Sequence, residues 1–148
     1  MVPRAGIVSV ESAAAATAFN RIELNPTDVI DICEIAISHD GPANNTDVPV
    51  RYRLRRTSTV GTGTAATPVK LRKDGAQALA TTALKDNTAD GTAVEDLHFF
   101  FVPIVSGILW VARPGLEFDC VAAEFLGLQN VSALPAGRKA ATHIVFRE

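Results

Sequence analysis

The clearest pattern of apolar and polar positions lies in the stretch VPVRYRLRR, residues 48–56. Val48, Val50, Tyr52 and Leu54 occupy one set of alternate positions, and Arg51, Arg53 and Arg55 occupy the other. Successive side chains of a β-strand point to opposite faces, so this alternation predicts a strand with one buried face and one basic face. Pro49 removes a backbone donor near its start, which favours the beginning of a strand or an edge.

Other short runs, each bounded by Gly, Pro, Asn or Asp, predict further strands. They cover residues 29–38, 68–72, 116–125 and 141–148. The most apolar run, residues 99–112, is interrupted by Pro103, Ser106 and Gly107. It is too short to span a bilayer and predicts two buried strands joined by a tight turn.

Helix signatures are scarce in this chain. The alanine-rich segment 11–19 lacks an apolar stripe of 3.6-residue period, which favours an extended segment, and the polar segment 85–96 predicts a loop. About seven to nine short strands without alternating helices predict an antiparallel β-sandwich of the jelly-roll-like kind. The length predicts a single domain over residues 1–148, with an extended N-terminal arm over 1–19 as an open alternative.

The bulk composition narrows the classes of function. Hydrophobic residues make up 47% of the chain and charged residues 20%, and the formal net charge is −2. Proteins that bind nucleic acid by neutralising phosphates carry a basic field, so we expect no nucleic-acid partner, and no segment predicts a membrane partner. The mean hydropathy of +0.18 suggests that other proteins or other copies of the chain cover part of its apolar surface.

The segment TVGTGTAATPVKL, residues 59–71, carries Gly61, Gly63 and Ala66 at the spacing of a dinucleotide-binding loop. Such a loop must connect a buried parallel strand to a helix whose N-terminus faces the phosphates. Here the preceding strand has a basic face, and Pro68 and the β-branched Val69 disfavour a following helix. We therefore expect a structural turn and no nucleotide cofactor.

Catalytic and metal-binding residue types show no recognisable spacing. His39, His98 and His143 form no H-x-H or H-x-x-x-H pair, so a site built from His98 and His143 with Glu95 or Asp96 is the remaining alternative. A G-x-S-x-G motif is missing from the sequence. The sequence thus predicts a protein that is not an enzyme and that needs neither a cofactor nor a metal.

Cysteines and acidic residues also indicate structural roles. Cys33 and Cys120 lie far apart in apolar segments, which favours two reduced, buried thiols over a disulfide. Four acids, Glu23, Asp28, Asp31 and Glu34, are too loosely spaced for a calcium loop and indicate solvated carboxylates.

Arginines form the most distinctive charged feature. Arg51, Arg53 and Arg55 are predicted to project from one sheet face about 6.6 Å apart, with Arg56 just beyond. Like charges at this spacing repel unless water, acids on a neighbouring strand or acids of a partner offset them. The favoured interpretation is a solvated or internally paired face. Docking to an acidic protein surface, or binding to nucleic acid or glycan, are the alternatives.

Three segments together carry a resemblance to a known family: EIAIS at 34–38, VPVRYRLRRTSTVGTGTAATPVKL at 48–71 and HIVFRE at 143–148. Over roughly residues 20–148 the chain resembles small β-proteins encoded among the structural genes of tailed bacteriophages, which are similar to head decoration (cement) proteins. Residues 123–140 have no counterpart in that pattern.

The resemblance implies a jelly-roll-like virion protein, often a homotrimer, without a small-molecule substrate. Such a protein binds the major capsid protein on the outer capsid surface and is present in the host cytoplasm before assembly. The candidate docking or subunit contacts are Arg51, Arg53, Arg55, Thr62 and Thr64.

Three other functions remain open. One is a tail, baseplate or fibre component of the same build. A carbohydrate-binding β-sandwich module is the second, but it requires exposed aromatic residues, whereas Trp110 lies in an apolar run and is expected to be buried. The third is a jelly-roll enzyme of the cupin type.

Overall fold

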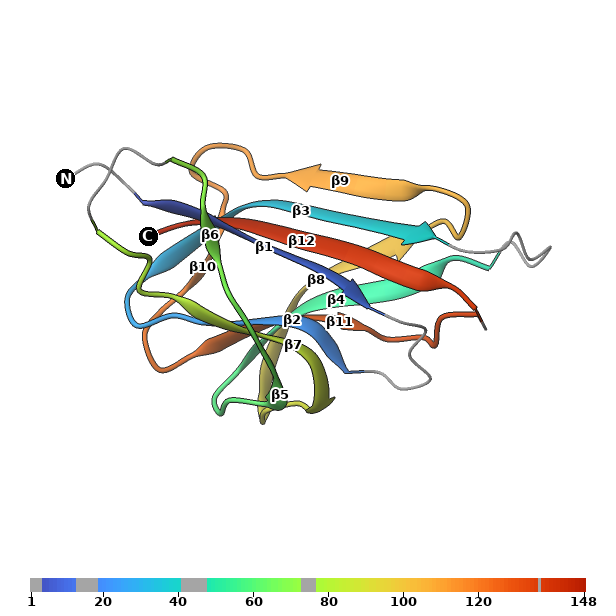
Figure 1. Cartoon of the computed structure of the whole chain (residues 1–148), viewed down its shortest axis with the longest axis horizontal. Helices are drawn as coiled ribbons and strands as arrows, with labels where there is room; N and C mark the ends of the chain where they lie inside the picture. Colours follow the sequence, from blue (N-terminus) through green and yellow to red (C-terminus); the bar gives the residue numbers. More distant parts are fainter. Residues whose placement is uncertain (1–3, 13–18, 41–47, 73–76, 136) are drawn as a thin grey trace.

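A computed structural model of the chain describes residues 4–12, 19–40, 48–72, 77–135 and 137–148. Two β-sheets pack face to face, and the described residues contain no helix, so none of them forms a helix that could cross a membrane (Figure 1). The prediction of an all-β, antiparallel sandwich in one domain is confirmed in its fold class.

Each sheet contains six strands. Sheet A consists of β1 (Ala5–Ser12), β3 (Ile30–Asp40), β6 (Val69–Lys70), β9 (Gly107–Val111), β10 (Phe118–Cys120) and β12 (Lys139–Arg147). Sheet B consists of β2 (Asn20–Asn25), β4 (Val50–Thr57), β5 (Thr62–Ala66), β7 (Thr82–Ala89), β8 (Ala93–Val102) and β11 (Phe125–Asn130).

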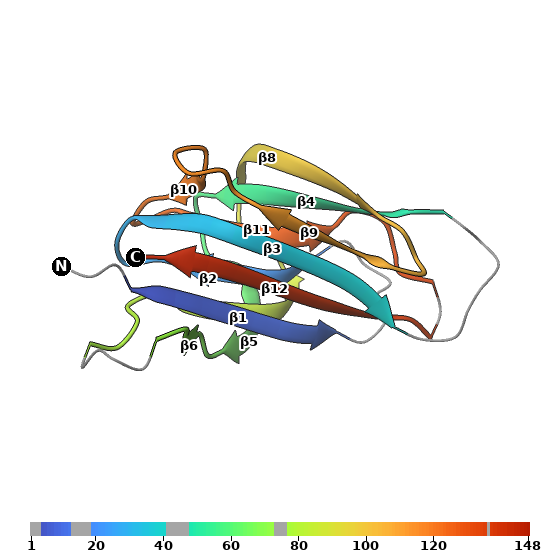
Figure 2. The same cartoon turned by 90° about the horizontal axis from the view of Figure 1, so that it is seen from above.

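The strand order is that of a jelly roll with an insertion. Sheet A runs β10-β3-β12-β1-β6, with β9 also paired to β3, and sheet B runs β5-β7-β2-β11-β4-β8. The chain alternates between the sheets from β1 to β4 and again from β8 to β12, except that β9 and β10 follow each other in sheet A. The neighbouring strands are antiparallel. Strands β5, β6 and β7 extend one edge of the sandwich, while β8, β9 and β10 form the opposite edge (Figure 2).

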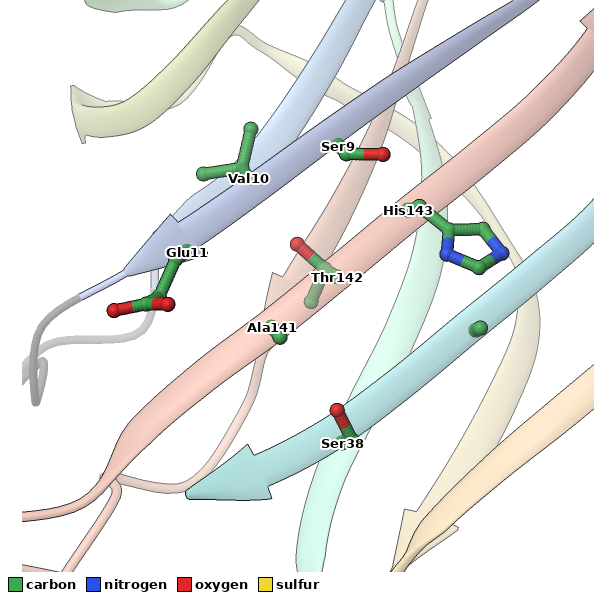
Figure 3. Close-up of a pocket in the computed structure, with 8 residues that line it drawn as sticks. Ser9, Val10, Glu11, Ser38, Ala141, Thr142 and His143 are labelled. Atoms are coloured by element: carbon green, nitrogen blue, oxygen red, sulfur yellow. The ribbon is translucent and has the colours of Figure 1, made fainter. Parts of the chain in front are cut away.

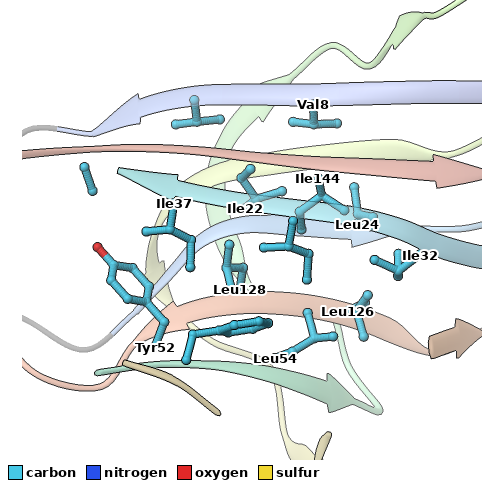
Figure 4. Packing of buried hydrophobic residues seen from close by; sticks show 14 of the residues in the cluster. Val8, Ile22, Leu24, Ile32, Ile37, Tyr52, Leu54, Leu126, Leu128 and Ile144 are labelled. Carbon is cyan, nitrogen blue, oxygen red and sulfur yellow. The ribbon is translucent and has the colours of Figure 1, made fainter. Parts of the chain in front are cut away.

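Side chains from both sheets fill the space between them (Figure 4). Sheet A contributes Val8, Ile32, Ile37 and Ile144, and sheet B contributes Ile22, Leu24, Tyr52, Leu54, Leu126 and Leu128, all at most 1% exposed. Each such side chain stabilises the fold by about 1.5–3 kcal/mol relative to an exposed one. The predicted inward face of residues 50–54 is therefore confirmed, whereas Val48 precedes the strand and is exposed.

Three sequence predictions about strands are wrong. Residues 116–125 do not form one strand, because β10 covers only Phe118–Cys120 and β11 begins at Phe125. Residues 85–96, expected to be a loop, belong mostly to β7 and β8. Residues 99–112 do contain two strand segments joined by a turn, but these lie in different sheets, and Phe101 and Leu109 are exposed. The content of polar and apolar residues is a poor guide here. The outer faces of β7 and β8 carry polar residues toward solvent, and the edge strands β8 and β9 leave apolar side chains uncovered.

The N-terminal segment contains a sheet strand. All eight residues of β1 pair with β12, from Ala5 opposite Arg147 to Ser12 opposite Ala140, so residues 5–12 are part of sheet A. Within the expected extended segment 11–19, residues 13–18 lie outside the described residues.

Candidate interaction surface

Two arginines of the predicted stripe bind a single carboxylate of the neighbouring strand. Arg55 on β4 lies opposite Asp96 on β8 and donates from Nε to Asp96 Oδ1 at 2.5 Å. Arg53 Nη1 lies 3.4 Å from Asp96 Oδ2, and Arg53 Nε donates to Gln129 on β11. The hydrogen bond from Arg55 lowers the pKa of Asp96 below its ordinary value. These two charges are offset within the chain.

Arg56 is held by a second acidic group. Its guanidinium contacts the carboxylates of Glu95 and Asp119, lies 3.7 Å from Glu124 Oε2 and also donates to the backbone carbonyl of Asp119. The contacts tie β4 to β8 and to the segment around β10. Arg56 therefore has a structural role in the described part of the molecule.

Arg51 differs from the other three arginines. Its guanidinium carbon lies 4.2 Å from the ring centroid of Phe99 and 5.9 Å from that of Phe101, both on β8. Within the described residues no carboxylate forms an ion pair with Arg51, and its side chain is exposed. Phe99 is 36% and Phe101 64% exposed. We refer to Arg51, Phe99 and Phe101 as the Arg51 patch, a cation over aromatic rings on the outer face of sheet B.

More apolar surface follows the same edge of the sandwich. The exposed large apolar side chains between β8 and β11 are Val94, Phe99, Phe101, Val105, Leu109, Val111, Leu116 and Val121. We call these residues the apolar edge. Phe99 and Phe101 lie on the outer face of sheet B, while Leu109 and Val111 alternate with the half-buried Trp110 on β9 of sheet A. An edge with this much uncovered apolar surface is typical of a contact with another protein.

Trp110 partly closes the gap between the two sheets at this edge. Its ring stacks on Phe118 with centroids 5.2 Å apart, and His98 lies near both rings. Trp110 is half-buried, which corrects the expectation that it is buried. Because Phe118 covers one face of the indole, Trp110 is poorly placed to stack on a sugar ring.

The glycine-rich segment does bind a carboxylate, but one that belongs to this chain. The backbone amide of Gly61 donates to Glu23 Oε1 at 2.8 Å, and Glu23 Oε2 accepts from Asn20 and Asn87 at 3.0 and 2.8 Å. A Cβ atom at Gly61 or Gly63 would overlap the side chain of Asn87, so both positions require glycine for close packing. Strand β5 follows directly and pairs antiparallel with β7, where a nucleotide-binding loop requires a helix.

The expectation that Glu23 is solvated is wrong, since its side chain is fully buried. Glu23 alternates with Ile22 and Leu24 on the central strand β2, and the residues around Gly61 cover it. No local signal identifies this burial, because the donors come from Asn87 and Gly61, which are remote in sequence.

Thr62 and Thr64 do not lie with the arginines. Both are exposed on β5, the strand of sheet B farthest from β8. The structure therefore places the sequence-derived candidates on opposite edges of sheet B, with Arg51, Arg53 and Arg55 near one edge and Thr62 and Thr64 at the other.

The histidines lie in three separate places. His98 lies on β8 against aromatic rings, His143 on β12 is 2.8 Å from Glu34, and His39 contacts Tyr52. The structure therefore does not bring His98 and His143 together, and no group of three potential metal ligands occurs among the described residues.

Cys33 and Cys120 are free thiols, and burial raises the pKa of Cys120 to about 12.

A shallow depression lies on the outer face of sheet A (Figure 3). Small side chains of three adjacent strands form much of it, namely Ser9 on β1, Ala36 and Ser38 on β3, and Ala141 on β12. Glu11 and His143 also line it. Small side chains on a sheet allow the surface of another protein to approach closely. The depression lies next to the part of the apolar edge on β9, because Ala36 is paired with Leu109.

No protein-family model matches this chain, and the search of curated proteins finds no significant match.

Proposed function

We propose that this protein is an adhesive structural component of a virus particle. More specifically, we infer a head decoration protein of a tailed bacteriophage, which binds the major capsid protein on the outer capsid surface and associates as a homotrimer. It would be present in the host cytoplasm before assembly. The resemblance of residues 48–71 and 143–148 to phage structural proteins supports this proposal.

The apolar edge is the observation that carries the proposal. Both edges of the sandwich end in edge strands, but the edge formed by β8, β9 and β10 exposes more large apolar side chains than the edge of β5 and β6, among them Phe101, Leu109 and Val111. Such uncovered side chains cost free energy in water unless another protein covers them. A contact along β8 to β10 would cover them.

The architecture suits repeated, modest contacts. The core joins both sheets, and β3 and β12 pair along almost their whole lengths, so the edge strands are fixed on a rigid body. Many copies that each make a small contact reinforce a lattice strongly, because binding at one site raises the effective concentration at the next.

Particle composition tests the proposal. Virus particles should be purified from cells that carry the gene for this chain, and its copies counted by quantitative mass spectrometry. We expect hundreds of copies per particle and density for the sandwich on the capsid lattice in a reconstruction. A few dozen copies or fewer would indicate a tail, baseplate or fibre component instead. Absence from the particles would overturn the virion role.

A further inference from the structure

Strand β8 ends sheet B, and among the described residues no strand pairs with its other side, which we call its free side. It pairs with β4 from Val102 opposite Val50 to Ala93 opposite Thr57, and β8 is the last strand in the sheet order. With ten residues it is one of the longest strands of the protein. The free side of an edge strand presents backbone N–H and C=O groups that can pair with a further strand.

The Arg51 patch adjoins this free side. Phe101 lies opposite Arg51 and Phe99 opposite Arg53, so both rings project from β8 to the outer face of sheet B. The Arg51 guanidinium leans toward β8, since it lies over the Phe99 ring. Arginine and aromatic side chains are enriched at the energetic centres of protein interfaces.

The charge of Arg51 indicates which kind of partner this surface would bind. Arg53, Arg55 and Arg56 each bind carboxylates of their own chain, whereas no ion pair to Arg51 occurs in the described part of the protein. A partner that places an acid at Arg51 would therefore gain a charge-assisted hydrogen bond without displacing an existing one.

We propose that an extended segment of a partner protein, rich in alternating acidic and apolar residues, adds to sheet B along β8. Its apolar side chains contact Phe99 and Phe101, and a carboxylate binds Arg51. Backbone pairing supplies affinity, and the Arg51 patch supplies the preference for acid. The inference names the chemistry of the partner in the adhesive role proposed above, and it rests on that role.

A second copy of this chain fits the surface less well. Two copies joined through β8 would bring two Arg51 patches to one continuous sheet face. The acids that β8 itself offers, Glu95 and Asp96, already bind Arg56 and Arg55. Self-pairing would thus add positive charge without a free carboxylate to offset it.

Peptide probes test the inference on the full chain. The ligand is an acetylated and amidated peptide of alternating Val and Glu, about as long as β8. A peptide of the same length with alternating Val and Lys is the charge-reversed control. Binding is followed by NMR through the backbone amides of residues 93–102. We expect shifts confined to β8 and its neighbours, and an affinity about fivefold higher for the Glu peptide at low salt.

Matched variants assign the preference to Arg51. Arg51→Glu should reverse the order of the two peptides, and Phe101→Ser should weaken both. Arg72→Glu makes the same change of charge near the opposite edge and should leave the preference intact, as should Val69→Ser on β6. Circular dichroism of each variant confirms that it is folded.

The result that overturns the inference is distinct from one that overturns the virion role. If the wild-type chain occupies particles but binds neither peptide, or binds both equally, the β8 inference is wrong and the decoration role stands. If Arg51→Glu changes the oligomeric state of the isolated chain, the patch is a self-interface and the inference is also wrong. If the chain binds the Glu peptide preferentially but is missing from virus particles, the virion role is wrong, while the inference about the chemistry of a partner at β8 is supported.

Discussion

The imidazole of His39 links the two sheets through the hydroxyl of Tyr52. His39 Nε2 on β3 lies 2.9 Å from Tyr52 Oη on β4, and His39 Nδ1 lies 3.2 Å from the carbonyl oxygen of Pro103. A carbonyl only accepts, so Nδ1 carries the proton, and in the neutral ring Nε2 accepts from the buried tyrosine. This pair therefore ties β3, β4 and the turn between β8 and β9 together while His39 is neutral.

Acidification should weaken the fold through His39. Burial, chiefly, and nearby Arg138 lower the pKa of His39, and the hydrogen bond to Pro103 offsets part of this. A histidine with a lower pKa in the folded state than in the unfolded state binds more protons when unfolded. Its contribution to stability is therefore present above the unfolded pKa and is lost as the pH falls through that value toward the folded pKa. Urea unfolding at pH 7.5 and 5.5 measures the loss.

The control for this prediction is His39→Gln, which cannot titrate. The variant should lose less unfolding free energy than the wild type between the two pH values. Equal losses would show that other groups cause the dependence.

Tyr52→Phe should destabilise the protein by about 1 kcal/mol, since it deletes one buried hydrogen bond and leaves the ring packing intact. Tyr52 is fully buried, and burial raises the pKa of its hydroxyl. Chemical denaturation of the variant at neutral pH measures the effect. An unchanged midpoint would mean that the contact with His39 adds no net stability.

Gly63→Ala should destabilise the protein by about 1–3 kcal/mol, because the added methyl group would overlap Asn87 and crowd the carbonyl of Lys85. Thr64→Ala on the same strand is the control, since Thr64 is exposed. Thermal unfolding distinguishes the two variants. If Gly63→Ala were as stable as Thr64→Ala, the glycine would not be needed for packing.

Glu23→Gln should cost about 2–4 kcal/mol. The buried carboxylate accepts from Asn20, Asn87 and the amide of Gly61, and a glutamine places an N–H₂ group against one of these donors. Glu11→Gln, on an exposed side chain that contacts Lys139, is the control and should unfold like the wild type. Equal stability of both variants would contradict the packing of Glu23 beneath the glycine-rich segment.

Self-association should depend on the part of the apolar edge on sheet A. Leu109 and Val111 are 63% and 58% exposed, and Leu109 lies opposite the small side chain of Ala36. We expect Leu109→Ser with Val111→Ser to shift sedimentation toward the monomer. Val69→Ser, an equally exposed position on β6, should have no such effect. A wild-type chain that stays monomeric at high concentration would contradict the expected homotrimer.

The sequence by itself determined the fold class and much of the core. Alternation with a period of two is a local property, so it identified β4 with its inward Tyr52 and Leu54, and it located most of β3 and β12. It also excluded a nucleotide-binding helix after Gly63, because Pro68 and the basic strand are visible without any knowledge of neighbouring strands.

Tertiary structure decided which strands are neighbours, and with that the partner of every charge. Asp96 lies 41 positions from Arg55 in the sequence, yet strand pairing places the two residues opposite each other. The same pairing left Arg51 beside phenylalanines at an open edge and enclosed Glu23 beneath a distant turn. Alternation states which side chains share a face of one strand, but it carries no information about what covers that face, because the covering groups come from segments far away in the chain.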